Sequence, residues 1–254
     1  DSMIKVGITG QKGFVGTHLF NYLGIQEDIE RIPFEDAFFE NNHQLQNFVR
    51  SCDAIVHLAA MNRHNDPEEL YKTNISLVKQ LIGACEATDS KPHILFSSST
   101  QEERNNPYGK SKLEGRQLFE SWAEKNNAPF TGLVIPNVYG PFGDPYYNSV
   151  VATFCHQLTH DEEPEIKVDG HLKLIYVQEL VEHIADKIKR KYSGKDEASR
   201  IEKWPLQHTA ETNVSSLLKI LKNFKSQYLE KGVIPSLDTP FKRNLFNTFV
   251  CYID

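Results

Sequence analysis

The 254-residue chain lacks an apolar run of the about 18 residues that a membrane-spanning helix requires, so we expect no membrane span. It also lacks an excess of positive charge, because 28 Lys and Arg stand against 34 Asp and Glu, for a net charge of -6. Nucleic acids and anionic membranes attract basic surfaces. Neither is therefore expected as a partner.

Cysteine is scarce, and its spacing is uninformative for metal or redox chemistry. The four cysteines are far apart and form no CxxC pair, which argues against a disulfide framework and against a cysteine metal centre. We predict reduced core thiols, a cytoplasmic protein and no bound metal. The four positions are Cys52, Cys85, Cys155 and Cys251.

Short β-type runs alternate with amphipathic helical stretches through the first half of the chain. Strands are predicted at 4–9 and 53–60, with helices at 14–24 and 67–88. This order predicts an α/β fold with a Rossmann-like, doubly wound parallel sheet.

The periodic pattern weakens after about residue 150. We predict an NAD(P)-binding domain over residues 3–165 and a smaller C-terminal substrate-binding lobe, intertwined with it, over residues 166–254. The charged stretch at 191–202 has few apolar anchors, and we expect it to be a surface loop.

Three glycines at a spacing of three follow the first predicted strand, in TGQKGFVG at 9–16. Gly10 would permit a tight turn, Gly13 would leave room for a pyrophosphate, and Gly16 would let helix and strand pack. The helix that follows offers free N–H groups and a positive dipole end to phosphates. A structural turn without a ligand is the alternative interpretation.

A tyrosine and a lysine stand four residues apart in PYGKSK, on a predicted helix. Tyr108 and Lys112 therefore project from one face, and a nearby ammonium lowers the pKa of a phenol, which makes it a usable acid. Ser99 ends a predicted strand in FSSS, nine residues before Tyr108, where its hydroxyl could bind a carbonyl oxygen. An exposed helical pair and an ordinary polar strand end are the alternatives.

Taken together, these motifs resemble the extended short-chain dehydrogenase/reductase family, from residue 4 to about 185. VHLAA at 56–60, PNVYGP at 136–141 and YVQELV at 176–181 match further signatures of that family. The resemblance implies a catalytic set of Ser99, Tyr108 and Lys112. It also implies that Asn74 supports the proton relay, although an ordinary polar helix position is the alternative.

The resemblance further implies cofactor and substrate contacts. The expected cofactor contacts are Gly10, Lys12, Gly13, Phe14, Val15, Gly16, Arg31, Asp53, Leu58, Ala59, Ala60, Tyr108 and Lys112. The expected substrate contacts are Ser98, Ser99, Asn137, Asn148 and Lys173. Asp53 could alternatively cap its strand.

Two departures from the wider family indicate a subgroup. Sugar 4,6-dehydratases place an Asp and a Glu after the catalytic hydroxyl residue, and this chain has Thr100 and Gln101 there, so dehydration lacks its acid and base. The loop between Ser99 and Tyr108 is also short. This shortening, together with FSSSTQEERNNPYGKSKLEG at 96–115 and PYYNSVVATFCHQL at 145–158, resembles the CapF-type reductases of capsule and O-antigen synthesis.

That subgroup implies NADPH-dependent reduction of the C4 ketone of a UDP-linked 2-acetamido-2,6-dideoxy-4-ulose, on the route to UDP-N-acetyl-L-fucosamine. Its members fuse the reductase domain to a C-terminal cupin domain, so we expect this chain to be part of a longer protein. The resemblance also implies a homodimer that associates through its long helices.

Cofactor choice and reaction class remain open at this stage. Glu35 and Asp36 follow the second predicted strand and favour NAD, whereas Lys12 and Arg31 could bind the 2'-phosphate of NADP, which we prefer. A nucleotide-sugar 4-epimerase with tightly bound NAD is the enzymatic alternative. A Rossmann-fold nucleotide-sensing or scaffold protein is the non-enzymatic one.

Overall fold

A computed structural model describes residues 2–61, 64–147 and 149–254. None of the helices in these ranges combines the length and the apolar character that crossing a membrane demands.

The chain divides into two compact units that exchange segments. Residues up to 135 together with 181–206 form the first unit, and residues 136–180 together with 207–254 form the second. The two units are interleaved in sequence, and their boundaries differ from the change at residue 165 that the sequence predicted. The physical cause is long-range pairing, because a strand from the C-terminal half returns to the edge of the first unit's sheet.

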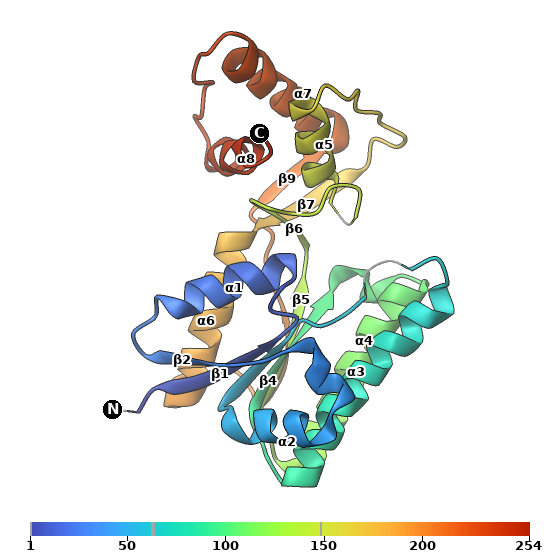
Figure 1. Cartoon of the computed structure of the whole chain (residues 1–254), viewed down its shortest axis with the longest axis vertical. Helices are drawn as coiled ribbons and strands as arrows, with labels where there is room; N and C mark the ends of the chain where they lie inside the picture. Colours follow the sequence, from blue (N-terminus) through green and yellow to red (C-terminus); the bar gives the residue numbers. More distant parts are fainter. Residues whose placement is uncertain (1, 62–63, 148) are drawn as a thin grey trace. The chain divides into compact units, whose positions relative to one another are not determined.

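A six-stranded sheet in the order β2-β1-β3-β4-β5-β8 forms the centre of the first unit (Figure 1). Every neighbouring pair is parallel. The strands are β1 (Ile4–Thr9), β2 (Ile29–Ile32), β3 (Ala54–His57), β4 (His93–Ser99), β5 (Phe130–Ile135) and β8 (Ile201–Pro205). The inner strands are almost wholly buried, as expected for a parallel sheet covered on both faces. The predicted Rossmann-like α/β fold is confirmed.

Helices cover the two faces of this sheet (Figure 1). On one face, the core includes Phe48, Leu81 and Phe119, one from each covering helix. The helices of this face are α2 (Asn42–Ser51), α3 (Pro67–Thr88) and α4 (Pro107–Asn126), with α1 (Phe14–Gly24) and α6 (Val177–Ser193) on the other. Short helical turns η1 (Asp36–Glu40) and η2 (Thr100–Glu103) follow β2 and β4.

The strand order reverses at β1, which pairs with β2 on one side and β3 on the other. In open α/β sheets, ligands bind at the carboxyl ends of the strands beside such a reversal. The glycine turn after β1 and the residues after β3 both lie there. The topology thus brings two of the predicted motifs together.

The second unit contains a three-stranded sheet in the order β6-β7-β9, with β6 and β7 parallel and β7 and β9 antiparallel. Leu158, Leu221 and Phe249 belong to its hydrophobic core. Its elements are β6 (Asn137–Tyr139), β7 (His171–Tyr176), β9 (Ala210–Asn213), α5 (Val150–Thr159), α7 (Val214–Phe224), the π-helical turn η3 (Lys225–Glu230) and α8 (Pro240–Val250).

The charged stretch at 191–202 is largely the surface loop that the sequence predicted, because residues 194–200 form no helix or strand and most of them are exposed. Its first residues end α6 and its last two begin β8. Within the loop, the Asp196 side chain is only 3% exposed and pairs with Lys187 and Lys191, a detail that hydrophobic patterning could not reveal.

Candidate active site

Tyr108 and Lys112 lie in the first turns of α4, beside the end of β4. Lys112 is buried, and its Nζ donates to the carbonyl oxygen of Ser97 at 2.8 Å. The same Nζ lies 5.6 Å from the centre of the Tyr108 ring. Burial lowers the pKa of Lys112 to about 8. The structure therefore brings the predicted phenol and ammonium together at the strand end.

Ser99 is the last residue of β4 and is half-buried. Alternate side chains of a strand share a face, so Ser99 projects on the same side as Ser97, whose carbonyl holds Lys112. Its Oγ accepts the N–H of Gln101 at 3.0 Å, which begins η2.

Ser98 does not fit the substrate contact predicted for it. Its side chain is almost inaccessible, and its hydroxyl donates to Oε2 of Glu102 at 2.5 Å. Ser98 points to the opposite side of β4 from Ser99 because successive side chains alternate. A run of three serines in the sequence could not show which of them faces the site.

Asn74 holds the segment after β3 against α4. Its Oδ1 accepts the N–H of Met61 at 2.6 Å, while its Nδ2 donates to the Met61 carbonyl at 2.9 Å and to Oγ of Ser111 at 3.3 Å. Ser111 in turn donates to the carbonyl oxygen of Tyr108 at 2.7 Å. Asn74 is thus a buried bridge between backbone segments, and Ser111 is a contact that the sequence did not single out.

The glycine turn has the geometry of a phosphate cradle. Gly10 has a φ of 71°, and a Cβ there would lie 2.8 Å from the backbone nitrogen of Ala59. A Cβ on Gly16 would overlap the carbonyl oxygen of Gly10, whereas one on Gly13 would only touch that oxygen, at 3.4 Å. Gly10 and Gly16 are therefore required by backbone packing, and Gly13 leaves open space above the turn.

The N-terminus of α1 differs from most of the other α-helix starts. Gly13 is its N-cap and no side chain caps it. Helices with a side-chain cap at this end are α2, α3, α4, α5, α7 and α8. The first-turn N–H groups of α1, which include those of Phe14 and Val15, thus suit an anionic ligand. Lys12, on the same turn, is exposed.

Thr9 and His57 join the carboxyl ends of β1 and β3, and neither was given a role from the sequence. Oγ1 of Thr9 accepts the N–H groups of Leu58 and Ala59, both at 3.1 Å, and lies 2.7 Å from Nδ1 of His57. Burial, followed by the charge of Lys112, lowers the pKa of His57 to about 3, so this imidazole is neutral. Both residues lie inside quoted motifs, TGQKGFVG and VHLAA, which was the available signal. The half-buried Ala60 follows them.

Two predicted cofactor contacts are corrected by their position. The guanidinium of Arg31 lies 4.0 Å over the ring of Phe20 and donates to the Phe20 carbonyl, about 9 Å along α1 from its start. Asp53 precedes β3 and accepts the N–H of Lys5 at 2.8 Å. Asp53 therefore stands at the amino end of the strand, away from the glycine turn, as a residue that caps its strand.

The remaining predicted substrate contacts belong to the second unit. Asn137 begins β6 and is exposed. Lys173 is exposed on β7, opposite Glu211 of β9. Asn148 lies outside the described residues.

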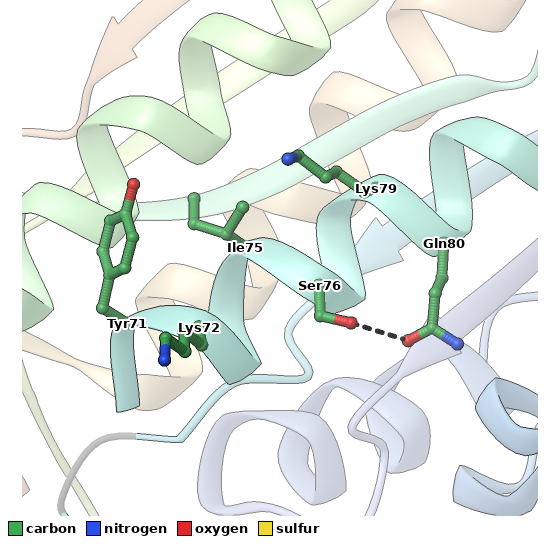
Figure 2. A pocket seen from close by; sticks show the side chains of 6 residues that line it. All are labelled: Tyr71, Lys72, Ile75, Ser76, Lys79 and Gln80. Atoms are coloured by element: carbon green, nitrogen blue, oxygen red, sulfur yellow. Dashed lines mark hydrogen bonds between the residues drawn. The ribbon is translucent and has the colours of Figure 1, made fainter. Parts of the chain in front are cut away.

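A hollow of about 480 Å³ runs along α3, and none of the predicted site residues lines it (Figure 2). Its lining residues are Tyr71, Lys72, Ile75, Ser76, Lys79 and Gln80. Tyr71 donates to Glu114 of α4, and Ser76 donates to Gln80. Within the described ranges, His, Cys, Asp and Glu side chains form no group of three or more that could hold a metal.

Comparison with known proteins matches residues 6–197 to the NAD dependent epimerase/dehydratase family. The chain is 35% identical over 179 residues to UDP-2-acetamido-2,6-beta-L-arabino-hexul-4-ose reductase of Pseudomonas aeruginosa, covering 70% of this chain and 48% of that protein.

Solved structures give the same picture. The capsular polysaccharide assembling protein CapF of Staphylococcus aureus is 30% identical with a TM-score of 0.79, over 98% of this chain and 66% of that one. RMD of Pseudomonas aeruginosa, solved with NADPH, shares the fold with a TM-score of 0.81 at 17% identity, over 98% and 97% of the two chains. The chain thus spans less than two thirds of the reductase and of CapF.

Proposed function

Because the chain belongs to the NAD dependent epimerase/dehydratase family, we propose that it reduces the C4 ketone of a UDP-linked 2-acetamido-2,6-dideoxy-4-ulose, using NADPH. The printed name of the Pseudomonas aeruginosa reductase supports a UDP-linked 4-ulose as substrate. The likeness to CapF supports a role in capsular polysaccharide or O-antigen synthesis. We place the enzyme in the cytoplasm as a homodimer, on the sequence resemblance alone.

One observation carries the proposal: a buried ammonium stands beneath a phenol at the carboxyl end of the strand that carries Ser99. Nζ of Lys112 is fixed by the Ser97 carbonyl and lies beside the Tyr108 ring. Burying an ammonium is costly, and here the buried ammonium lies beside a phenol, where it can stabilise the phenolate that proton donation leaves.

The cofactor fits the residues at the reversal of strand order. The uncapped start of α1 and the glycine turn suit a pyrophosphate, and Leu58, Ala59 and Ala60 follow the neighbouring strand β3 at the same edge of the sheet. Lys12 is the cation that we assign to the 2'-phosphate of NADP. Gln11 ties this turn to the segment after β2 through the Phe34 carbonyl.

When bound, NADPH supplies the hydride for the ketone carbon. Tyr108 donates a proton to the ketone oxygen as charge develops there, and the hydroxyl of Ser99 donates a hydrogen bond to the same oxygen. The Lys112 ammonium, 5.6 Å from the Tyr108 ring, would stabilise the phenolate that forms as Tyr108 gives up its proton. Asn74 holds α4 and the segment after β3 in fixed positions relative to each other.

Glu102 is an acidic residue close to Ser99, but it is not available as the acid or base of a dehydration, which favours reduction. Burial acts to raise its pKa, but hydrogen bonds from Arg116 and Ser98 outweigh burial and lower it. Glu102 is consequently held as a carboxylate within an ion pair and is not free to exchange protons with a substrate.

The test is turnover of a UDP-linked 4-keto sugar by the purified chain, followed as loss of NADPH absorbance and as the hydrogenated product by mass spectrometry. We expect stoichiometric loss of NADPH with product formation. NAD that remains bound through purification, together with exchange of the C4 stereochemistry and no net NADPH consumption, would instead establish the 4-epimerase. A chain that binds the cofactor yet turns over neither substrate would be the nucleotide sensor.

A further inference from the structure

A buried ion pair lies under the loop that follows Ser99. Arg116 of α4 donates to both carboxylate oxygens of Glu102, from Nε to Oε2 at 3.1 Å and from Nη2 to Oε1 at 2.8 Å. The side chains are 9% and 3% exposed. The pair is thus bidentate and almost completely withdrawn from water.

The same carboxylate is attached directly to β4. The hydroxyl of Ser98 donates to Oε2 of Glu102 at 2.5 Å, and Ser98 is the neighbour of Ser99. Since Ser98 and Ser99 face opposite sides of the strand, fixing one side chain fixes the direction in which the other points. Two buried contacts therefore link Arg116 to Ser98, the residue that precedes Ser99 in β4.

Two glycines make room for this arrangement. A Cβ on Gly109 of α4 would overlap the carbonyl oxygen of Gln101, so the loop lies directly on the first turn of the helix. A Cβ on Gly132 of β5 would lie 2.7 Å from Cδ of Arg116. Glycine inside a strand is otherwise unfavourable and marks a close approach. Here it lets the arginine stem cross the strand.

The loop itself has little slack. Only residues 100–107 separate Ser99 from Tyr108, and both ends are fixed by caps: Ser99 accepts the N–H of Gln101, and Asn106 accepts that of Gly109 at 2.8 Å. Glu102, in the middle of the loop, is held by its contacts with Arg116 and Ser98. If Glu102 shifts, a loop this short must move at its start, where Ser99 lies.

We propose that the Glu102–Arg116 ion pair is a positioning device that holds the Ser99 hydroxyl in place for catalysis, an inference that rests on the proposed function. Stability alone does not explain the pair, because well-packed apolar residues often replace a buried ion pair without loss of stability. Glu102 and Arg116 act through Ser99 and touch no substrate.

The test is a double-mutant cycle between Glu102→Gln and Ser99→Ala, with NADPH and the keto sugar. We expect Glu102→Gln to lower kcat about tenfold with KM for NADPH unchanged, and to change kcat less than about twofold once Ser99 is alanine. A loss that is the same in both backgrounds, or an unchanged kcat in Glu102→Gln, overturns the proposal.

Glu102→Gln leaves the buried Arg116 with Glu120 as its remaining carboxylate partner, so a second variant protects the test against unfolding. Glu102→Leu/Arg116→Met removes both charges, and we expect it to remain folded with the same loss of kcat and the same dependence on Ser99. Wild-type kcat in this folded variant overturns the proposal. Asp196→Asn, which alters a buried ion pair at the other end of the sheet, is the matched control and should leave kcat unchanged.

Hydrogen exchange gives a readout that does not depend on the reaction. The Gln101 amide, which donates to Ser99, should exchange at least about tenfold faster in Glu102→Gln and at the wild-type rate in Asp196→Asn. Equal rates in the wild type and Glu102→Gln overturn the proposal. If the wild type does not reduce the sugar, the proposed function is wrong, and this exchange measurement alone decides whether the pair anchors Ser99.

Discussion

The two ends of the six-stranded sheet carry similar buried polar groups in different surroundings. At the carboxyl ends, Nδ1 of His57 lies 2.7 Å from the Thr9 hydroxyl, and at the amino ends Nε2 of His93 lies 2.9 Å from that of Thr131. Burial lowers the pKa of both histidines to about 3. Within the described ranges, each has one buried ring nitrogen without a partner.

Each end also has a buried ion cluster. Glu102 and Arg116 lie beneath the carboxyl end of β4, while Lys187 contacts Asp196 at 3.2 Å and Glu202 at 2.9 Å near the amino ends of β5 and β8. Perturbed and buried charges therefore do not by themselves mark a site. What distinguishes the carboxyl end is the glycine turn, the uncapped start of α1 and the phenol of Tyr108 that lie there.

The largest expected effect is at the carboxyl end. Tyr108→Phe removes the proton donor and should lower the single-turnover rate of reduction by about 100- to 10,000-fold, with NADPH binding nearly unchanged. Tyr71→Phe, which removes a hydroxyl from α3, is the control and should retain activity. Near-normal turnover in Tyr108→Phe would remove the phenol from the mechanism.

The amino-end cluster should respond in stability instead. Asp196→Asn leaves buried lysines without their shared carboxylate and should lower the free energy of unfolding by about 3 kcal/mol. Denaturant titration measures this loss. If Asp196→Asn also lowers kcat strongly, the amino-end cluster affects catalysis as well as stability, which contradicts the proposed difference between the two ends of the sheet.

The pH dependence of that loss follows from the Asp196 carboxyl. Burial acts to raise its pKa, but hydrogen bonds from Lys187 and Lys191 outweigh this and lower it below the usual 3.8. Its stabilising contribution is therefore present above about pH 4 and is lost as the pH falls through the folded-state pKa. The difference in stability between wild type and Asp196→Asn should shrink on acidification.

The lowered pKa of Lys112, at the carboxyl end of the sheet, predicts an alkaline limb in the pH profile, which means that activity falls as the pH rises. The Lys112 pKa of about 8 means that raising the pH beyond this value removes the ammonium and weakens Tyr108 as an acid. We expect kcat/KM for NADPH to fall about tenfold per pH unit above about pH 8. In Lys112→Arg the limb should move to higher pH, because guanidinium stays charged, while the exposed Lys110→Arg leaves it in place. If the alkaline fall in activity occurs at the same pH in Lys112→Arg, a group other than Lys112 causes it.

The smallest expected effect concerns cofactor choice. Lys12→Ala should weaken NADPH binding about tenfold and leave NADH binding almost unchanged, since only NADPH carries the 2'-phosphate. Titration of both cofactors measures the ratio, and Lys5→Ala, on β1, serves as a control. Equal losses for both cofactors would place Lys12 on the shared pyrophosphate rather than on the 2'-phosphate.

Sequence reasoning recovered the motifs that depend on local spacing. Tyr108 and Lys112 share a helix face because four residues make about one turn, and Gly10 and Gly16 are required where a strand turns into a helix. The expectations that failed depended on where a side chain points or on which end of a strand a residue occupies. Arg31 and Asp53 were close to the motifs in sequence, but the structure turns one toward Phe20 and places the other at the opposite strand end.

The sequence by itself determined the α/β fold, the glycine turn and the pairing of Tyr108 with Lys112, because each follows from contacts within a few residues along the chain. Only the tertiary structure decided that Ser98 faces Glu102 and Arg116, that Thr9 joins His57, and that β8 completes the sheet. These contacts join residues whose meeting depends on strand order and side-chain direction. Strand order and these side-chain contacts cannot be read from hydrophobic periodicity, since ion pairs and sheet edges impose no regular spacing on the sequence.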